Sequence, residues 1–352
     1  MIYVWYCKCK VFKDWISMGA SLREVARKAG VSTSTVSRYV KGELNVTVDT
    51  SRKIQDAMSE VGWSPRLKKD PSLNSIALLV PSLTNPFFAS LADEIVVAAK
   101  FENKQISVHL TGGGLASEIS TLKAVLKNDS IHGILYVGNN MLDEVIDVTS
   151  FNKPFVMVDE IVLSSESLNK VPYVVSGNLN GAYQATSHLI VNGHENIALV
   201  GGPVGLSSAE QRELGFRKAM KAHGLACSED LVFRGPYSEA FGASILPALV
   251  NKKISVSAVF ACSDIIAVGL IRAAKESNLD IPKDLSIIGF DNIPLCDWLS
   301  PRLTTVSQPV SEMATAALQA LISQSHQRSF ENAVLPMRLV TRASVEKINN
   351  QK

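Results

Sequence analysis

The segment from Ser32 to Tyr39 concentrates side chains that can read nucleic acid. It holds five Ser and Thr hydroxyls and one Arg within eight residues. A recognition helix needs short polar groups such as Thr33 and Ser34 at its amino end, because its backbone must approach the base edges in the major groove. Arg38, one turn later, can bridge guanine O6 and N7, a contact that contributes ~1–3 kcal/mol of base discrimination. The alternative interpretation is an exposed face of a weakly helical segment.

These side chains can contact bases together only if a folded domain holds their helix in place, and the flanking residues predict such a domain. Ser21 is placed to cap a first helix and Gly30 to end it. Ser32 caps a second helix, and Thr47 or Asp49 opens a third. Three short helices, the first two joined by a tight turn, are typical of a helix-turn-helix. We expect contacts with bases and phosphates from Ser32, Thr33, Ser34, Thr35, Arg38, Lys41 and Thr47.

The charge of the chain is distributed unevenly. The 352 residues carry 35 Lys+Arg and 33 Asp+Glu, a formal net charge of +2. Residues 1–70 hold 13 basic and 7 acidic residues, a net of +6, and residues 71–352 hold 22 and 26, a net of −4. A small basic head on a mildly acidic body predicts that the head meets a polyanion, with chance clustering as the alternative.

Composition excludes several classes of protein. A hydrophobic share of 46% with 19% charged residues is typical of globular domains and not of disordered chains. No apolar run approaches the roughly 18–20 residues that span a bilayer, so we expect no membrane partner. Five Cys without a framework spacing favour a reducing compartment, and we therefore expect a cytoplasmic protein.

The first 17 residues do not fit the pattern that follows them. They include Cys7 and Cys9, but a Cys-x-Cys pair without nearby His or further Cys is a weak metal signal. Met18 lies just before the first patterned segment. Our hypothesis is that the working protein starts at Met18 and that residues 1–17 are a start-site artefact or a disordered tail.

Beyond a polar, Pro-containing linker over residues 65–75, apolar runs alternate with amphipathic stretches. This alternation predicts βαβ units and, at this length, two doubly wound parallel-sheet lobes with a ligand cleft between them. The expected strands are 76–80, 106–110, 131–137, 155–158, 173–175, 197–200, 258–261 and 286–290. The expected helices are 87–101, 117–127, 180–192, 208–223, 238–251, 265–277 and 311–323.

Five segments occur in an order that is known from one family. They are Leu22–Arg38, Ile76–Phe88, Gly193–Gly202, Ile281–Asn292 and Pro301–Pro309. Together they resemble the LacI/GalR family of bacterial transcription regulators. The resemblance implies a homodimeric repressor that reads a pseudo-palindromic DNA operator, and a two-lobed receptor for a small sugar or nucleoside, related in fold to type I periplasmic binding proteins.

The resemblance also implies a division of the chain. The expected parts are a DNA-binding domain at 18–64, a hinge at 65–75 and a receptor at 76–345, with one lobe at 76–176 and 309–334 and the other at 177–308 and 335–345. The hinge departs from the family pattern, because only ten residues separate Pro65 from Ile76 and Asp70-Pro71 opposes a helix. Leu67 is the remaining candidate for the side chain that family members wedge into the minor groove.

Residues for effector binding follow from the same motifs. The resemblance places Phe87, Phe88, Asp159, Arg212, Tyr237, Ser263 and Asp291 at the ligand. Acceptor carboxylates, one guanidinium fork and aromatic walls suit a polyhydroxylated ligand. A purely structural role is the alternative for each, and we expect Asp264 to cap the helix at 265–277. Gly177 stands where the family usually has an Asp, and the carboxyl-terminal motifs resemble cytidine- and pentose-responsive members.

Catalysis finds little support in the sequence. It contains no Gly-x-Ser-x-Gly elbow, phosphate-binding Gly-x-x-x-x-Gly-Lys or His-Glu-x-x-His helix, so we expect no catalytic residue, metal or cofactor. The preferred hypothesis is an effector-controlled repressor in the bacterial cytoplasm, associated with the nucleoid. The alternative is a small-molecule binding protein whose degenerate hinge has uncoupled the effector from DNA. An enzyme on the same fold is a third, weaker possibility.

Overall fold

The computed structural model describes residues 21–40, 46–61, 74–138, 147–161, 171–250 and 256–348. The chain divides into two compact units, Met1–Lys69 and Asp70–Lys352. Our expectations for the leader at 1–17, for Lys41 and for the hinge residues 65–73, with Leu67, lie outside the described residues.

Three helices form the first unit: α2 (Leu22–Ala29), α3 (Thr33–Val40) and α4 (Val48–Glu60). Ser21 caps α2 in a reciprocal capping box with Glu24, and Gly30 ends it in the left-handed conformation, at φ 67°. The Ser32 hydroxyl accepts from the Thr35 N–H at 3.0 Å and so caps α3. Thr47 does the same for α4 through the Thr50 N–H at 3.3 Å, so Thr47 rather than Asp49 opens the third helix.

A small apolar core holds these helices at their angle. One face of each of the three helices contributes to this core. Its buried members are Val25, Ala26, Ala29, Val36, Ile54 and Ala57. The Tyr39 hydroxyl adds a polar tie from α3 to α4, where it contacts Ser51 and accepts from the Gln55 amide.

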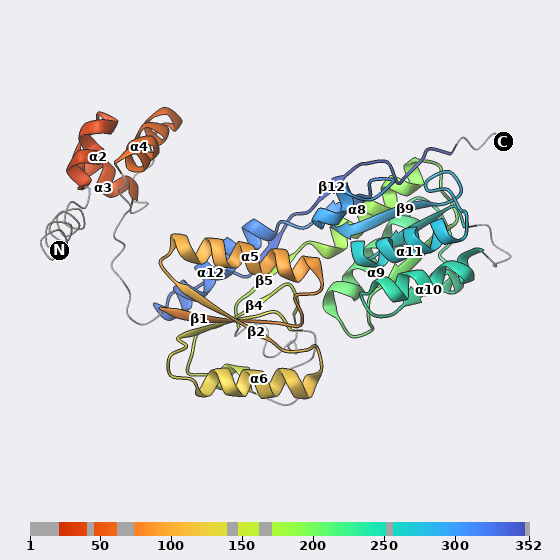
Figure 1. The fold of residues 1–352 in the computed structure, drawn as a ribbon, viewed down its shortest axis with the longest axis horizontal. Helices are drawn as coiled ribbons and strands as arrows, with labels where there is room; N and C mark the ends of the chain where they lie inside the picture. The colour runs from red at the N-terminus through yellow and green to blue at the C-terminus, as the bar shows by residue number, and fades with distance from the viewer. Residues whose placement is uncertain are drawn as a thin grey trace, which may run out of the picture. The chain divides into compact units, whose positions relative to one another are not determined.

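The second unit contains two six-stranded sheets (Figure 1). The first has the order β11-β5-β4-β3-β1-β2, and its strands pair in parallel. The second has the order β12-β10-β9-β8-β6-β7, parallel except for the antiparallel pair of β10 with β12. The strands of the first sheet are β1 (Ser75–Val80), β2 (Gln105–Leu110), β3 (Gly133–Tyr136), β4 (Phe155–Val158), β5 (Tyr173–Ser176) and β11 (Ala333–Leu335). Those of the second are β6 (Ile197–Gly201), β7 (Val232–Arg234), β8 (Ala258–Ala261), β9 (Ser286–Asp291), β10 (Thr304–Ser307) and β12 (Arg338–Val340).

Helices cover both faces of each sheet, which is why the central strands read as continuous apolar runs. On the first sheet, α5 and α12 pack together on one face and α6 lies on the other (Figure 1). On the second, α8 and α9 cover one face and α10 and α11 the other. The helices are α5 (Pro86–Phe101), α6 (Leu115–Lys127), α8 (Asn178–Val191), α9 (Ser207–Ala222), α10 (Glu239–Val250), α11 (Asp264–Glu276) and α12 (Val310–Ser325), with short 3-10 turns η1 (Val148–Ser150), η2 (Glu229–Leu231) and η3 (Pro294–Asp297).

The chain passes between the two sheets three times. It crosses after β5 at Gly177, after β10 at Gln308 and between β11 and β12 at Pro336. Each sheet is therefore assembled from segments that are far apart in sequence. All eight expected strands are present, and the structure adds β7, β10, β11 and β12, which the sequence pattern did not indicate. Three of these are three residues long, and β10 (Thr-Thr-Val-Ser) is polar in composition.

Within the described part of the chain, no helix is long and apolar enough to cross a bilayer.

Candidate DNA interface and ligand cleft

Of the residues expected to read DNA, those that the structure describes lie on α3 and at the starts of α3 and α4. Thr33, Ser34 and Arg38 are exposed on α3, whereas Val36 is fully buried beneath them. Ser32 directs its hydroxyl to Ser34 at 2.8 Å and Thr35 at 2.7 Å, in addition to capping the helix. Helix α4, which has 13 residues, begins directly after the exposed cap residue Thr47. The helix thus presents short polar groups at its amino end and one guanidinium a turn later.

A cavity of about 280 Å³ lies in the second unit, where strands of both sheets end. Parallel strands place their following loops at one edge of the sheet, so residues that are distant in sequence meet there. All seven of the expected effector residues line this cavity. They are Phe87, Phe88, Asp159, Arg212, Tyr237, Ser263 and Asp291. The remaining lining residues are Pro81, Ser82, Thr84, Asn85, Glu160, Pro203, Leu206, Ser208 and Pro236.

Arg212 on α9 is the buried cation of the cleft, with 3% of its surface exposed. Its Nε donates to Asn178 Oδ1 at 2.8 Å, and its Nη1 donates to the Cys262 carbonyl at 2.6 Å and to Asp291 Oδ1 at 3.4 Å. The guanidinium lies 3.9 Å from the centre of the Phe290 ring, a cation–π contact that fixes its plane. Arg212 is therefore a positioned fork rather than a freely moving charge.

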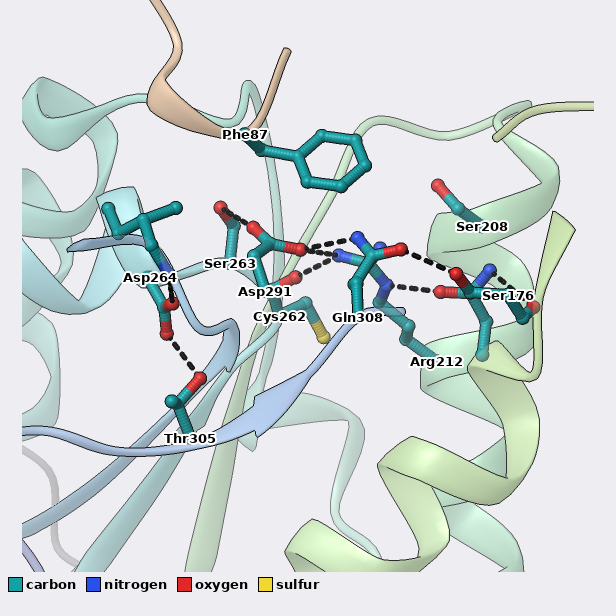
Figure 2. Close-up of polar contacts among 12 residues, drawn as sticks. Phe87, Ser176, Ser208, Arg212, Cys262, Ser263, Asp264, Asp291, Thr305 and Gln308 are labelled. Atoms are coloured by element: carbon teal, nitrogen blue, oxygen red, sulfur yellow. Dashed lines mark hydrogen bonds and ion pairs between the residues drawn. The ribbon is translucent and has the colours of Figure 1, made fainter. Parts of the chain in front are cut away.

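Asp291 is the second anchor of the same network (Figure 2). It accepts from Ser263 Oγ at 2.8 Å and from Gln308 Nε2 at 2.8 Å. The Gln308 carbonyl then accepts from Ser176 Oγ at 2.7 Å, and the amide of Asn178 donates to the Ser176 carbonyl. Because Arg212 also bonds Asn178, the hydrogen bonds close into a ring that includes two of the crossings between the sheets.

The sequence did not indicate three members of this ring, Ser176, Asn178 and Gln308. Each is buried, with at most 6% exposed. A sequence does not distinguish a buried Ser, Asn or Gln from an exposed one, and only the position of these residues at or just after the ends of β5 and β10 indicates their role. Gln308 in the Ser-Gln-Pro sequence was the available signal, since a polar residue directly after a strand can line a cleft.

Two adjacent carboxylates, Asp159 and Glu160, follow β4 and face α9. Glu160 accepts from Ser207 Oγ at 2.8 Å, from the Ser208 N–H at 3.1 Å and from the Ser208 hydroxyl in a short contact. Asp159 has a positive φ of 73°, and its buried Oδ1 has no hydrogen-bond partner among the described residues. Burial, and then repulsion from Glu160, raise the pKa of Asp159 to about 8, although Arg212 opposes the shift.

A pH prediction follows from the raised pKa of Asp159. The folded chain keeps a proton on Asp159 that the unfolded chain loses near pH 4, so this group lowers the free energy of unfolding as pH rises from about 4 to about 8. Asp159→Asn, which resembles the protonated carboxyl, is expected to match the unchanged protein near pH 4 and to unfold at a higher temperature at pH 9, by about 1.4 kcal/mol for each unit by which folding raises the pKa. Thermal unfolding across this range measures the difference. Glu210→Gln, which neutralises an exposed carboxylate on α9, is the control, and an equal pH effect in both variants would contradict the assignment.

Asp264 does not cap its helix as the sequence suggested. Ser263 occupies the N-cap position and α11 begins at Asp264 itself. The Asp264 side chain turns away from the helix and accepts from the Ile293 N–H at 2.9 Å, from Thr305 Oγ1 at 2.6 Å and from Cys296 Sγ at 3.1 Å. A cap would have used the N–H groups of its own helix, but the buried loop after β9 supplies closer donors. Asp264 thus holds β9, η3 and β10 together beneath the cleft.

No group of three or more His, Cys, Asp or Glu residues in the described ranges could hold a metal ion.

The chain combines a three-helix domain, whose second helix exposes short polar side chains, with a domain of two mostly parallel sheets and a cavity between them. This combination defines a class of ligand-responsive DNA-binding regulators. Two family models match the chain, the lacI family of bacterial regulatory proteins over residues 21–66 and the periplasmic binding protein-like domain over residues 186–345. The HTH-type transcriptional regulator DegA of Bacillus subtilis is 30% identical over 94% of this chain and all of its own length. The HTH-type transcriptional repressor CytR of Escherichia coli is 30% identical over 87% of this chain and 89% of its own.

Solved structures agree with this class. The transcriptional regulator CelR in complex with cellobiose has a TM-score of 0.70 at 26% identity and covers 92% of this chain and 99% of its own. The lac repressor dimer bound to operator and the anti-inducer ONPF has a TM-score of 0.68 at 24% identity, covers 93% of this chain and 99% of its own, and shares the fold. The chain belongs to the LacI family of bacterial transcription regulators. It is a DNA-binding regulator with an effector-binding domain, and not an enzyme.

Proposed function

We propose that this chain is a homodimeric repressor that reads a pseudo-palindromic operator, and that a small sugar or nucleoside-like effector in the cleft sets its operator affinity. The convergence of all seven expected effector residues on one cavity carries the proposal. The DNA-binding domain occupies residues 18–64, the hinge residues 65–75 and the receptor residues 76–345. The protein acts in the bacterial cytoplasm, at the nucleoid.

The lining of the cavity supports a polyhydroxylated effector. Asp159 and Asp291 offer carboxylate acceptors, Arg212 offers a positioned fork of donors, and Phe87 and Tyr237 offer flat apolar faces. A LacI family regulator from Enterococcus faecium, 28% identical to this chain with a TM-score of 0.67, was solved with bound ribose. The similar transcriptional regulator CelR was solved with cellobiose.

An apolar strip on the first sheet supports the dimer. Val97 and Phe101 on α5 are 39% and 78% exposed, and Val108 and Leu110 on the edge strand β2 are 40% and 55% exposed. Since α5 packs against β2, these exposed side chains belong to adjacent elements at one edge of the sheet. Contiguous exposed apolar residues on a monomer mark interfaces. A second copy of the chain, related by a two-fold axis, would cover this strip with its own and bring two heads to one operator.

The alternative, a receptor uncoupled from DNA, rests on the ten residues between Pro65 and Ile76. It predicts effector binding that leaves operator affinity unchanged.

The test of the proposal is selection of operator sequences from random duplexes, followed by gel shifts at several salt concentrations. The logarithm of affinity should fall with that of salt at a slope near −0.9 for each phosphate contact. A full palindrome should bind far more tightly than a half-site. Arg38→Ala is expected to lose about 1–3 kcal/mol and to relax the base preference at one position in each half-site.

The control for Arg38 is Arg52→Ala, an exposed Arg on α4. It should keep the base preference. Binding that is insensitive to salt and unchanged in Arg38→Ala would show that α3 does not read the operator.

A further inference from the structure

The lining of the cleft is strongly unbalanced in charge. Three buried carboxylates, those of Asp159, Glu160 and Asp291, line the cavity beside a single cation, Arg212. Asp264 lies directly behind, fully buried, and accepts three hydrogen bonds from the loop after β9 and from β10. The guanidinium already bonds Asp291, Asn178 and the Cys262 carbonyl. The described residues of the lining therefore offer an anionic ligand no cation that is free of an internal partner.

Helix N-termini are the usual anion sites of such a fold, because their first N–H groups lack partners within the helix. Three helices begin at this cavity, α5, α9 and α11. On α5, the Asn85 side chain accepts from the Phe87 N–H at 3.0 Å. On α11, Asp264 places a carboxyl group in the first turn, although this side chain bonds the loop after β9 and β10 and not the N–H groups of the helix.

At the start of α9, a carboxylate from elsewhere in the chain occupies the place where an anionic ligand group would bind. Its N-cap residue is Leu206, which has no side-chain oxygen to offer. The Glu160 carboxylate, which comes from the other sheet, takes that place and receives the Ser208 N–H and the hydroxyls of Ser207 and Ser208. One backbone N–H and two hydroxyls converging on an anion are the donor set that would bind a phosphate or carboxylate group of a ligand.

We infer that the effector of this cleft carries neither phosphate nor carboxylate, and that Glu160 determines this specificity by occupying the start of α9 as an internal anion. The inference rests on the proposed function of the cleft. It selects, among sugars and nucleosides, the unphosphorylated ones.

A polar atom of the lining without an internal partner, Asp159 Oδ1, supports the same inference. Asp159 Oδ1 is buried in the lining and has no hydrogen-bond partner among the described residues, so it is open to a group of the ligand. A ligand hydroxyl can accept from the protonated carboxyl and donate to the ionised one, whereas an ionised phosphate or carboxylate oxygen can only accept and therefore suits only the protonated form. Burial already raises the pKa values of Glu160 and Asp291, and an added anion would oppose the ionised forms further.

The first arm of the test uses matched ligand pairs on the full-length protein. Ribose and ribose 5-phosphate, cytidine and cytidine monophosphate, and adenosine and adenosine monophosphate are titrated by thermal shift and calorimetry at constant ionic strength. The neutral member of any pair that binds should bind at least ~30-fold more tightly than its phosphate, because like charges across an interface are strongly unfavourable. A phosphorylated member that binds as tightly as its neutral parent overturns the inference.

The second arm uses inorganic phosphate, so it does not depend on finding the effector. The unchanged protein should show no saturable phosphate binding beyond that of an equal ionic strength of chloride. Glu160→Ala should gain it, with affinity at least ~10-fold above the unchanged protein, because the start of α9 is then open. Glu160→Gln keeps the shape and removes the charge, and should gain less.

Glu210→Ala is the matched control. Glu210 lies in the first turn of the same helix but is exposed and outside the cleft lining, and its loss changes the net charge equally. Phosphate binding that is equal in Glu160→Ala and Glu210→Ala, or absent from both Glu160 variants, overturns the role of Glu160. These measurements involve no DNA, so a failure of operator control leaves them interpretable, and their failure leaves operator control standing.

Discussion

Arg212→Met is expected to lower the free energy of unfolding of the second unit by about 3–5 kcal/mol, because it leaves buried carboxylates without their cation. The ion pair between Arg212 and Asp291 has only 4% and 5% of its side chains exposed, so water replaces the lost partner poorly. Met retains much of the apolar contact with Phe290. The variant also loses the donor fork of the proposed effector site. Urea unfolding monitored by circular dichroism measures the loss.

The double variant Arg212→Met/Asp291→Asn is the control that separates charge from packing. Removing the unpaired carboxylate should restore a large part of the stability, while effector binding stays lost. The deficit of the single variant should also grow as pH rises, because an Asp291 carboxyl without Arg212 has a higher pKa and its ionised form becomes harder to bury. If Arg212→Met unfolds at the same urea concentration as the unchanged protein, the guanidinium is not the counter-charge of this cluster.

Ile54→Ala is expected to reduce operator affinity at least ~100-fold at 37 °C, because the loss of a buried Ile costs about 2–5 kcal/mol and a domain this small is marginally stable. Ile54 is fully buried in the core that aligns α2, α3 and α4. A head that is mostly unfolded cannot present Thr33, Ser34 and Arg38 together. Calorimetry should show the loss or early melting of one transition and an unchanged transition for the second unit.

The matched control is Ile287→Ala, an equally buried Ile on β9 in the second unit. It should lower the transition of the second unit and leave that of the head unchanged. Full operator binding by Ile54→Ala would show that the head does not depend on this core. Destabilisation of both transitions by either variant would contradict the separation of the two units.

Much of the architecture was predictable because the central strands are covered on both faces. Ile76–Val80 is buried along its whole length, so it is continuously apolar in sequence and easily distinguished from the amphipathic helices that follow. The convergence of Phe87, Arg212 and Asp291 was implied by the resemblance to the family, and the topology accounts for it, since each residue ends a strand or lies on the helix after one and parallel sheets bring those ends together. Their role at a ligand stays a prediction.

The missed residues share a physical cause. Glu160 and Gln308 are polar side chains whose burial depends on partners far away in sequence, Ser208 and Ser176, and a single sequence does not show such pairs. Asp264 was assigned to the nearest helix start because local capping is the commonest use of an Asp there. Short edge strands such as β11 and β12 carry too few residues for a period to be visible.

The three crossings between the sheets have a consequence for how the protein is made on the ribosome. β11 pairs with β5 through Ala333 and Val174, so the first sheet is incomplete until almost the whole chain has been synthesised. The head, whose core is drawn from residues 25–57, needs no later segment. Because non-local pairing is slow and exposes sheet edges in the meantime, the nascent chain can fold its DNA-binding head before the effector-binding domain is complete.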